Sequence, residues 1–500
     1  MLALVLAGAL AIAFALTLIA LRVRWAGFDP HHVMYLDEPW YLQAAQSLLQ
    51  HGKAMLCEQG WERMECVPYP KALGWPVILA GTFTLTGPSD LAAIRTATVL
   101  GALTAPLAAV VSRGLGATRL QSLFAAAFLA VYPAHAVWSA TAETNVPGAF
   151  FVLVALVGLV HVLRNGAASG VALAASALCV APAVRPETAL MFVPAVIAIV
   201  TSDALPRRRR ATALAALAVA LAVSVAAIVP MWRLNAAIAG DGTFLRLARV
   251  SESLRALPRE VWGFHALLIA IATVVAFERR SWFTHGLLAA GVGQLVVGLA
   301  FHQFADRLLL TGTVAILPLA AFVPGTSGKR EEFSDDVPTA VRLIALGLGF
   351  AGVAAIVGVA LRSLSLQGRS TETQVLETRL PAIVRASVRS PKALVVTEMP
   401  AVLSHASPAP VMATRTALVG GAERLAAMAR DRDVYFVCDM YCESGFGGGQ
   451  GPTSCARFVR ELKLEPVART SLHARQYGIF RVLGLRPVEE PMASLGCPGQ

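Results

Sequence analysis

Long apolar runs dominate this 500-residue chain and decide what it can fold into. Several reach the roughly 20 residues that an α-helix needs to cross a hydrocarbon core about 30 Å thick. Their Leu, Ala, Val and Gly residues do not alternate with polar ones, which excludes a β-barrel. Hydrophobic residues make up 56% of the chain, above the roughly 45–50% of soluble domains. The sequence therefore predicts a polytopic α-helical membrane protein.

About eleven segments are predicted to be membrane helices, and a twelfth is too short to cross. The short one, 72–85, contains Gly74 and Pro76 and predicts an interfacial or re-entrant helix. The first run ends in Arg22 and Arg24 without a clear cleavage site, so we expect an uncleaved helix, with a signal peptide as the alternative. The expected spans are 2–21, 92–112, 120–138, 146–163, 168–184, 188–201, 211–231, 262–277, 284–301, 308–323 and 340–361.

The basic residues predict the orientation of the chain. The formal net charge of +11 does not indicate a nucleic-acid partner, because the basic residues are spread over short loops between apolar segments. Such loops are typically cytoplasmic. A cytoplasmic amino terminus places most of them inside, Arg22 and Arg24 being the exception: Arg113, Arg164, 207–210, Arg279, Arg280, Lys329 and Arg330. We therefore expect a multi-pass protein of the cell (inner) membrane.

The composition changes near Arg362 to that of a soluble α/β domain. Short β-rich stretches at 393–397, 433–438 and 477–482 predict strands, and 423–430 has a helical pattern. We expect a transmembrane domain at 1–361, with a first extracytoplasmic loop at 22–72, and a small C-terminal extracytoplasmic α/β domain at 362–500.

The cysteines lie mainly in the two polar regions. Cys57 and Cys66 are in the first loop, and the tail contains four more, Cys438, Cys442, Cys455 and Cys497. Even numbers in both regions favour disulfides in an oxidising compartment. Zinc binding by the tail cysteines is the alternative, but no histidine or further cysteine has finger spacing.

An acidic pair, Asp37-Glu38, follows the first apolar run. Asp37 is in a position to cap a helix that continues with Pro39 in its first turn. The cap does not account for two carboxylates beside Trp40 and Tyr41, which are aromatics suited to a membrane interface. The pair is therefore a candidate for chemistry as well as for capping.

Four further ionisable residues fall on the same predicted side, next to apolar spans. They are Glu143, Arg185, Glu187 and Arg307. A charge at the centre of a membrane helix costs roughly 2.5–3.5 kcal/mol, so such groups usually pair or line a cavity. Mutual ion pairs and a functional site are both consistent with these positions.

The order of these features resembles the GT-C superfamily of polyprenyl-phosphate-sugar-dependent glycosyltransferases, above all its protein mannosyltransferase and aminoarabinose transferase branch. The resemblance covers about 1–360. It rests on Asp37-Glu38, Tyr-Pro-Lys-Ala-Leu at 69–73, 87–95, Glu143, Arg185-Pro186-Glu187 and 302–307. The chain departs from the family pattern at Pro70-Lys71, where two prolines are common, and at Arg307-Leu308, where an Arg-Tyr pair is common.

The resemblance implies transfer of a sugar from a polyprenyl-phosphate donor to a lipid, protein or glycan acceptor at the extracytoplasmic face. It implies Asp37 as the base, with Glu38 as its partner or substitute. Because phosphate is a weak base, it leaves without a general acid but needs a fixed cation. Candidates for binding the donor and its phosphate are Arg185, Arg307, Glu143, Glu187 and Tyr41.

The resemblance leaves a divalent metal ion open, because some members bind one through acidic loop residues and others need none. Asp37, Glu38 and Glu143 offer the oxygen ligands that such ions prefer, whereas His31-His32 fits a polar loop better. Two other functions remain: a lipid or glycan transporter or flippase, and a non-catalytic assembly protein. A flippase would be expected to contain inverted repeats, and the halves of the sequence show no clear repeat.

Overall fold

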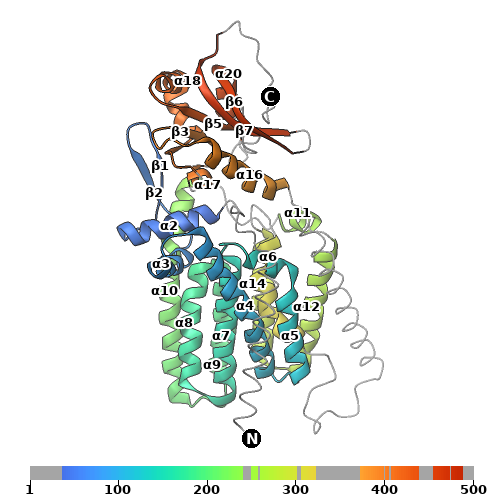
Figure 1. Cartoon of the computed structure of the whole chain (residues 1–500). Helices are drawn as coiled ribbons and strands as arrows, with labels where there is room; N and C mark the ends of the chain where they lie inside the picture. Colours follow the sequence, from blue (N-terminus) through green and yellow to red (C-terminus); the bar gives the residue numbers. More distant parts are fainter. Residues whose placement is uncertain are drawn as a thin grey trace. The chain divides into compact units, whose positions relative to one another are not determined.

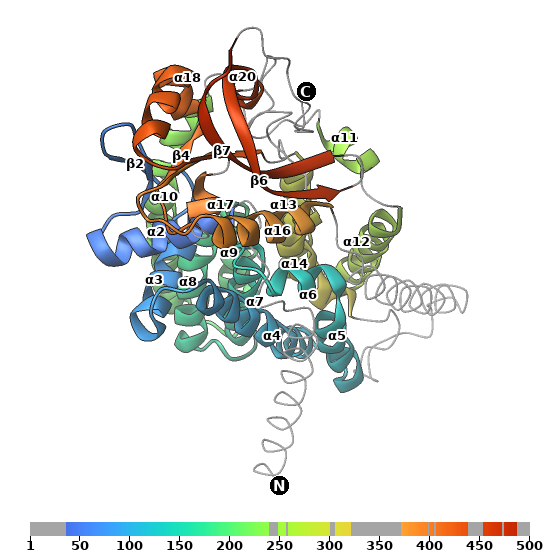
Figure 2. The same ribbon diagram turned by 45° about the horizontal axis from the view of Figure 1, so that its top comes forward.

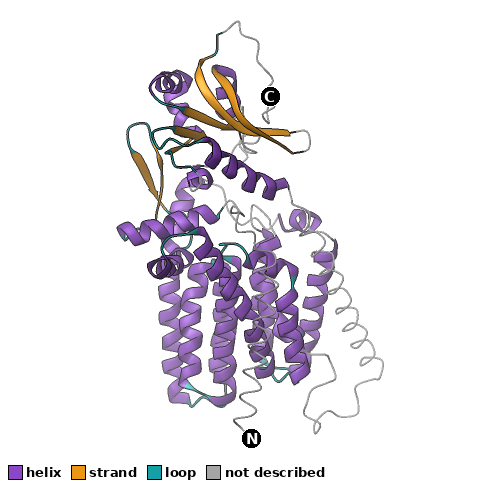
Figure 3. Cartoon of the chain, in the orientation of Figure 1, coloured by secondary structure: helices purple, strands orange, loops and turns teal. Residues whose placement is uncertain are grey.

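The computed structural model describes residues 37–239, 249–256, 259–300, 306–321, 372–398, 400–404, 407–438, 454–472 and 475–487. The chain divides into two compact units (Figure 1). The membrane unit combines 1–28 with 70–368, and the second unit combines 29–69 with 369–500. The described part of the membrane unit is helical, whereas the second unit contains all the described strands (Figure 3). The predicted boundary at 361/362 lies outside the described residues.

Helices account for every regular element described in the membrane unit. In chain order they are α3 (Gly74–Thr86), α4 (Asp90–Gly114), α5 (Arg119–Val131), α6 (Pro133–Ser139), α7 (Asn145–Asn165), α8 (Ala168–Val184), the 3-10 helix η1 (Pro186–Met191), α9 (Phe192–Thr201), α10 (Arg207–Ala239), α11 (Arg249–Ala256), α12 (Arg259–Arg279), α13 (Trp282–Ala300), the 3-10 helix η2 (Asp306–Leu309) and α14 (Leu310–Ala320).

Four of the described helices are long and apolar enough to cross a membrane: Asp90–Gly114, Asn145–Asn165, Arg207–Val229 and Trp282–Ala300. Each overlaps a predicted span, and α3 has the short length expected of 72–85. The single span predicted at 120–138 is wrong, because the chain breaks between α5 and α6. Tyr132 is extended there (φ −61°, ψ 115°), since the residue before a proline disfavours the helical region. The predicted spans 2–21 and 340–361 lie outside the described residues.

Small residues let neighbouring membrane helices pack closely. A Cβ added to Gly158 of α7 would lie 2.6 Å from the backbone nitrogen of Ala174 in α8. Likewise, a Cβ on Gly74 of α3 would lie 2.5 Å from the carbonyl carbon of Ala183. Apolar side chains gain little from burial between helices in lipid, so close backbone approach at small residues is a main source of helix association.

Basic residues gather at one end of the helices. Arg164, in the last turn of α7, donates a hydrogen bond 3.0 Å long to the backbone oxygen of Arg113, in the last turn of α4. Arg210 donates to the backbone oxygen of Ser202 at 2.7 Å, and a Cβ on Gly166 would touch Ala204. The loops that follow α4, α7 and α9 therefore share one end. The opposite end of α7 is about 31 Å away for a 21-residue helix.

The second unit contains a five-stranded sheet with the order β4-β3-β5-β7-β6. The strands are β3 (Leu394–Thr397), β4 (Val411–Ala413), β5 (Val434–Cys438), β6 (Leu462–Leu472) and β7 (Arg475–Leu485). β3 is parallel to β4 and β5, while β7 is antiparallel to β5 and β6. The long strands β6 and β7 lie side by side in Figure 2. The helices are α16 (Glu372–Ser387), α17 (Pro400–Ser404), α18 (Thr414–Asp431) and α20 (Ser454–Glu461). The predicted strands and helix correspond to β3, β5, β7 and α18, whereas β4 and β6 were not predicted.

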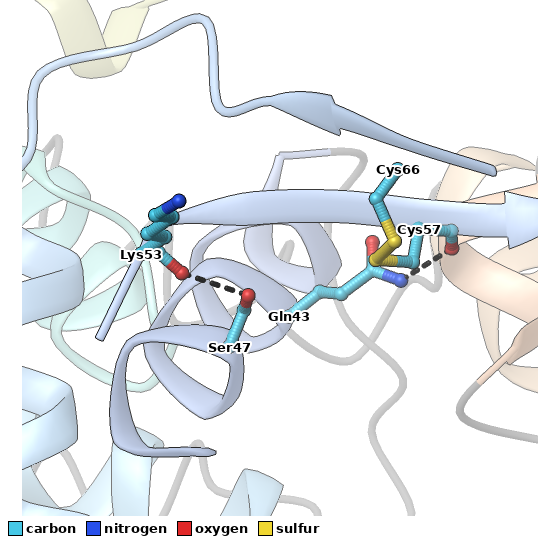
Figure 4. The surroundings of a disulfide bond; sticks show 5 residues. All are labelled: Gln43, Ser47, Lys53, Cys57 and Cys66. Carbon is cyan, nitrogen blue, oxygen red and sulfur yellow. Dashed lines mark hydrogen bonds between the residues drawn. A yellow bond between two sulfur atoms is a disulfide. The ribbon is translucent and has the colours of Figure 1, made fainter. Parts of the chain in front are cut away.

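The same unit contains the helix and hairpin of the first loop. α2 (Glu38–His51) ends at Gly52, which has a left-handed backbone (φ 67°), and leads into the antiparallel strands β1 (Met55–Gln59) and β2 (Met64–Pro68). Cys57 and Cys66 face each other in the register and form a disulfide (Figure 4). This confirms the prediction for the first loop. Cys438 in β5 is also disulfide-bonded, in line with the disulfides predicted for the tail rather than with zinc binding.

Loss of the Cys57–Cys66 disulfide is expected to loosen the hairpin. The bond closes a loop with a sequence separation of 9, for which chain entropy predicts a stabilisation of about 2–3 kcal/mol. Amides in 55–68 of a Cys57→Ala/Cys66→Ala variant should therefore exchange hydrogen about 30- to 150-fold faster, measured by mass spectrometry. Cys179→Ala, which removes the free cysteine of α8, is the control and should leave that exchange unchanged. Equal exchange in all three proteins would contradict a stabilising role of the bond.

Candidate functional site

Asp37 begins α2 but does not make the predicted capping bond. Its backbone oxygen accepts from the amides of Trp40 at 3.1 Å and Tyr41 at 3.3 Å, so Asp37 occupies the N-cap position. Its backbone is helical (φ −90°, ψ −24°), and its side chain makes no capping hydrogen bond. An N-cap carboxylate reaches the first turn from an extended backbone, which explains the difference. The Asp37 carboxylate is thus not committed to capping the helix.

The other two candidates on α2 are buried. Glu38 is 0% exposed and Tyr41 is 4% exposed. The Tyr41 ring packs edge-to-face against Tyr69, with 6.3 Å between the ring centroids. A fully buried carboxylate is costly unless it is paired or protonated. Unlike a solvent-exposed loop acid, Glu38 therefore needs a partner or a proton.

Glu143 and Arg307 form an ion pair in the membrane unit. The Nη1 atom of Arg307 lies 3.0 Å from Oε1 of Glu143, whose side chain is 1% exposed. The Arg307 guanidinium also lies over the Trp138 ring, 5.1 Å from its centroid. Both contacts use a delocalised, planar cation, the property that favours arginine over lysine beside carboxylates and aromatic rings.

Backbone contacts fix the turn that presents Glu143. The buried Trp75 of α3 donates its indole N–H to the backbone oxygen of Ala142 at 2.6 Å. Thr98 of α4 donates to the backbone oxygen of Ser139 at 2.9 Å. These bonds satisfy carbonyl groups that would otherwise be buried without a partner, a requirement in an apolar environment. The turn between α6 and α7 is therefore held from two helices.

Arg185 and Glu187 form the second ion pair. Pro186 begins η1, so α8 ends at Val184 and Arg185 takes an extended backbone between the two helices. Both Nε and Nη2 of Arg185 lie 2.6 Å from Oε1 of Glu187. The two side chains are 15% and 10% exposed. Such a partly buried, charge-assisted pair is short and directional.

The two ion pairs meet around the first turns of α7. Nη1 of Arg185 lies 3.5 Å from the hydroxyl of Thr144, the residue after Glu143. A Cβ added to Gly148 would lie 2.6 Å from Cγ of Arg185 and 3.5 Å from Cγ2 of Thr311, which is one turn beyond Arg307. We call the four residues Glu143, Arg185, Glu187 and Arg307 the ionic cluster. The cluster lies at the α7 end opposite the basic loops.

The structure thus brings together the four predicted site residues of the membrane unit, and the other three belong to the second unit. Asp37, Glu38 and Tyr41 belong to the start of α2 in the second unit. Sequence reasoning missed Trp75, Thr144, Gly148 and Thr311, which surround the cluster. Of these, only Trp75 could have been suspected from the sequence, since it closely follows the 69–73 motif.

Within the described ranges, no group of three or more His, Cys, Asp or Glu side chains is arranged to hold a metal ion, and His31-His32 lies outside them.

Comparisons with known proteins agree on one fold. Residues 70–232 match the family model described as dolichyl-phosphate-mannose-protein mannosyltransferase. No curated protein matches the sequence. Among solved structures, ArnT from Cupriavidus metallidurans in the apo state has a TM-score of 0.54 at 14% identity, covering 95% of this chain and 98% of that chain. The chain has the fold of the GT-C superfamily of glycosyltransferases.

Two further GT-C structures show how widely the fold is shared. The Archaeoglobus fulgidus oligosaccharyltransferase in the apo form has a TM-score of 0.55 at 11% identity, covering 98% of this chain and 75% of that chain. Arabinofuranosyltransferase AftD from Mycobacteria has a TM-score of 0.52 at 14% identity, covering 95% of this chain and 42% of that chain. The family match includes Glu143, Arg185 and Glu187 but begins after Asp37 and ends before Arg307.

Removing one partner of the buried Glu143–Arg307 pair should destabilise the membrane unit. Glu143→Ala leaves the largely buried Arg307 guanidinium without its carboxylate, a change that costs about 3 kcal/mol in comparable pairs. We expect a clearly lower thermal midpoint in detergent. The control is Glu461→Gln, which breaks the exposed Arg457–Glu461 pair and should hardly shift the midpoint. A midpoint equal to that of the unchanged protein would show that the ion pair does not hold these helix ends.

Proposed function

We propose that the chain is an inverting membrane glycosyltransferase that moves a sugar from a polyprenyl-phosphate donor to an acceptor at the extracytoplasmic face. The observation that carries the proposal is the ionic cluster, which holds two arginines at one end of apolar helices. A second ArnT structure from Cupriavidus metallidurans has undecaprenyl phosphate bound. The oligosaccharyltransferase AglB from Archaeoglobus fulgidus has been solved in complex with a dolichol-phosphate. Lipid phosphates of this kind therefore bind to proteins with the same fold.

The leaving group explains why arginines are needed. When the bond between the anomeric carbon and the phosphate oxygen breaks, the electron pair and its negative charge stay on the phosphate. A preorganised cation stabilises that charge in the transition state. Arg185 and Arg307 are held by Glu187 and Glu143 at 2.6 and 3.0 Å, so neither must be reoriented at the moment of reaction. We propose that either or both contact the leaving phosphate.

The acceptor must lose a proton as it attacks. A hydroxyl oxygen or an amine nitrogen forms the new bond to the anomeric carbon, and a carboxylate takes the proton. We propose Asp37 for this role, which the resemblance to the GT-C superfamily implies; it occupies the N-cap of α2, next to the buried Glu38. Glu38 and Tyr41 are both buried. We propose that Glu38 assists Asp37 as its partner or substitute, and that Tyr41 helps to bind the donor. Transfer by one displacement inverts the anomeric configuration.

The opposite ends of the membrane unit support the proposed orientation. The basic loops after α4, α7 and α9 lie at one end, where the positive-inside rule predicts the cytoplasm. The ionic cluster lies at the other end, which we assign to the extracytoplasmic face of the cell membrane. The disulfide-bonded Cys57, Cys66 and Cys438 also fit an oxidising compartment, and hence an extracytoplasmic second unit.

Asp37→Asn should abolish transfer without changing the amount of folded protein. An amide cannot accept the acceptor proton, and loss of a general base lowers turnover by about 10²–10⁴-fold. The measurement is transfer from a polyprenyl-phosphate sugar by purified protein, with donor and acceptor chosen from mass spectrometry of envelope lipids and glycans with and without the protein. Glu62→Gln, an exposed acid in the turn of the same loop, is the matched control.

The outcomes separate the competing functions. Unchanged transfer in Asp37→Asn would contradict the assignment of the base. A loss of lipid transport with an unchanged glycan profile would favour a flippase. An envelope profile that is the same with and without the protein would instead favour a non-catalytic assembly protein.

Gly148→Ala should impair turnover by displacing Arg185. The added methyl group would lie 2.6 Å from Cγ of Arg185, and a displacement of about 1 Å in a positioning group can cost 10²-fold. We expect kcat to fall by about 10- to 100-fold. Alanine favours a helix by about 0.5–1 kcal/mol over glycine, so the variant should fold. Gly263→Ala in α12, where no atom lies within 4 Å of an added Cβ, should keep full activity. Full activity of both variants would exclude Arg185 from the reaction.

A further inference from the structure

Trp61 joins the first-loop hairpin to the C-terminal sheet domain within the second unit. Its indole nitrogen donates to the backbone oxygen of Thr416 in α18 at 3.0 Å. The Arg424 guanidinium lies over its ring, 4.5 Å from the centroid. The indole also packs against the core cluster that includes Phe436 and Leu425. A polar, a cationic and an apolar contact therefore converge on one side chain, and the Thr416 contact alone spans 355 positions of the sequence.

The surface of α18 that contacts Trp61 leaves space for the indole ring. A Cβ added to Gly420 of α18 would clash with Cζ2 of Trp61 and would lie 2.7 Å from its Nε1. Glycine at this position is therefore required by the indole. Next to it, the Thr416 hydroxyl donates to Oε1 of Glu58 in β1 at 3.3 Å. Side chains from β1 and from the turn of the hairpin thus meet α18.

β1 also contacts β4 and α17, whereas β2 pairs with β1 alone among the described strands. Every residue of β2 is exposed, and an isolated two-stranded hairpin is marginally stable at best in water. The Cys57–Cys66 disulfide links the two strands to each other, but it does not attach them to anything else. Attachment of the turn to α18 comes from Trp61 and Glu58.

The hairpin in turn holds α2. Gln43 donates its amide to the backbone oxygen of Cys57 at 2.6 Å, and the Ser47 hydroxyl donates to the backbone oxygen of Lys53 at 2.8 Å (Figure 4). Both donors lie on α2, whose first residue follows Asp37. A continuous path of contacts therefore runs from α18 through Trp61 and the disulfide-linked strands to α2.

We propose that the C-terminal domain is a positioning domain for α2, and that Trp61 is a positioning residue of this arrangement beside the direct packing of α17 against α2. By docking against Gly420, Thr416 and Arg424, Trp61 fixes the hairpin and so the helix that begins after Asp37. The effect on catalysis rests on the proposed role of Asp37 as the base. The docking itself does not depend on that role, and the two can be tested separately on the same samples.

The test compares Trp61→Ala, Trp61→Phe and Gly420→Ala in the full chain, purified in detergent. Hydrogen exchange of 38–68 is measured by mass spectrometry alongside kcat and KM for the lipid-linked donor. We expect exchange in α2 and the hairpin to rise at least tenfold in Trp61→Ala and Gly420→Ala, with β3 and β5 unchanged. On the proposed function, kcat falls about tenfold while KM changes little, and Trp61→Phe recovers part of both effects. Val419→Ala, at an exposed neighbouring side chain, is the control.

A double variant separates docking from general damage. If Gly420 matters only because the indole lies against it, Gly420→Ala should add no effect in the Trp61→Ala background. Unchanged exchange of α2 in both single variants would overturn the proposal. Faster exchange with unaltered kcat would support the docking by Trp61 but contradict an effect of that docking on turnover. Absence of any transfer by the unchanged protein would count against the proposed function alone, because the exchange data still decide whether Trp61 anchors α2.

Discussion

Ionised side chains at the ends of apolar helices must be paired or hydrated, and this constraint organises the membrane unit. Arg185 is satisfied by Glu187 at 2.6 Å and Arg307 by Glu143 at 3.0 Å, so the break at Pro186 and the turn at 139–144 are arranged around these pairs. The small residue Gly148 then brings Arg185 against α7. The same pairs that make the charges tolerable also hold two arginines in fixed positions. The ionic cluster can therefore stabilise the fold and also bind a phosphate.

The second unit is stabilised differently, by packing between residues that are far apart in the sequence. Its sheet core is formed by residues such as Val396, Phe436 and Phe480. The first loop joins this core through Trp61, while the Cys57–Cys66 disulfide closes the hairpin. The loop that contains the proposed base thus belongs, by its contacts, with the end of the chain rather than with its beginning.

Local patterns in the sequence predicted most of the helices and three of the strands. They predicted the C-terminal end of α8 to the residue because Arg185-Pro186 terminates an apolar run. The break at Tyr132 was missed because apolar residues continue across Pro133. No local pattern could predict that Thr144 and Gly148 contact Arg185, or that Trp61 contacts Thr416, since these contacts depend on tertiary packing. The shared side of the four residues of the ionic cluster followed from topology, whereas Asp37 as the base stays a prediction.

We propose above all that the ionic cluster binds the phosphate of a lipid-linked sugar. An electron cryo-microscopy structure of the protein in lipid nanodiscs with undecaprenyl phosphate tests it most directly. Binding by the ionic cluster predicts density for the phosphate in contact with the guanidinium of Arg185 or Arg307, and loss of that density in a variant lacking both arginines. Phosphate bound elsewhere, with both arginines still engaged only by Glu187 and Glu143, would contradict it.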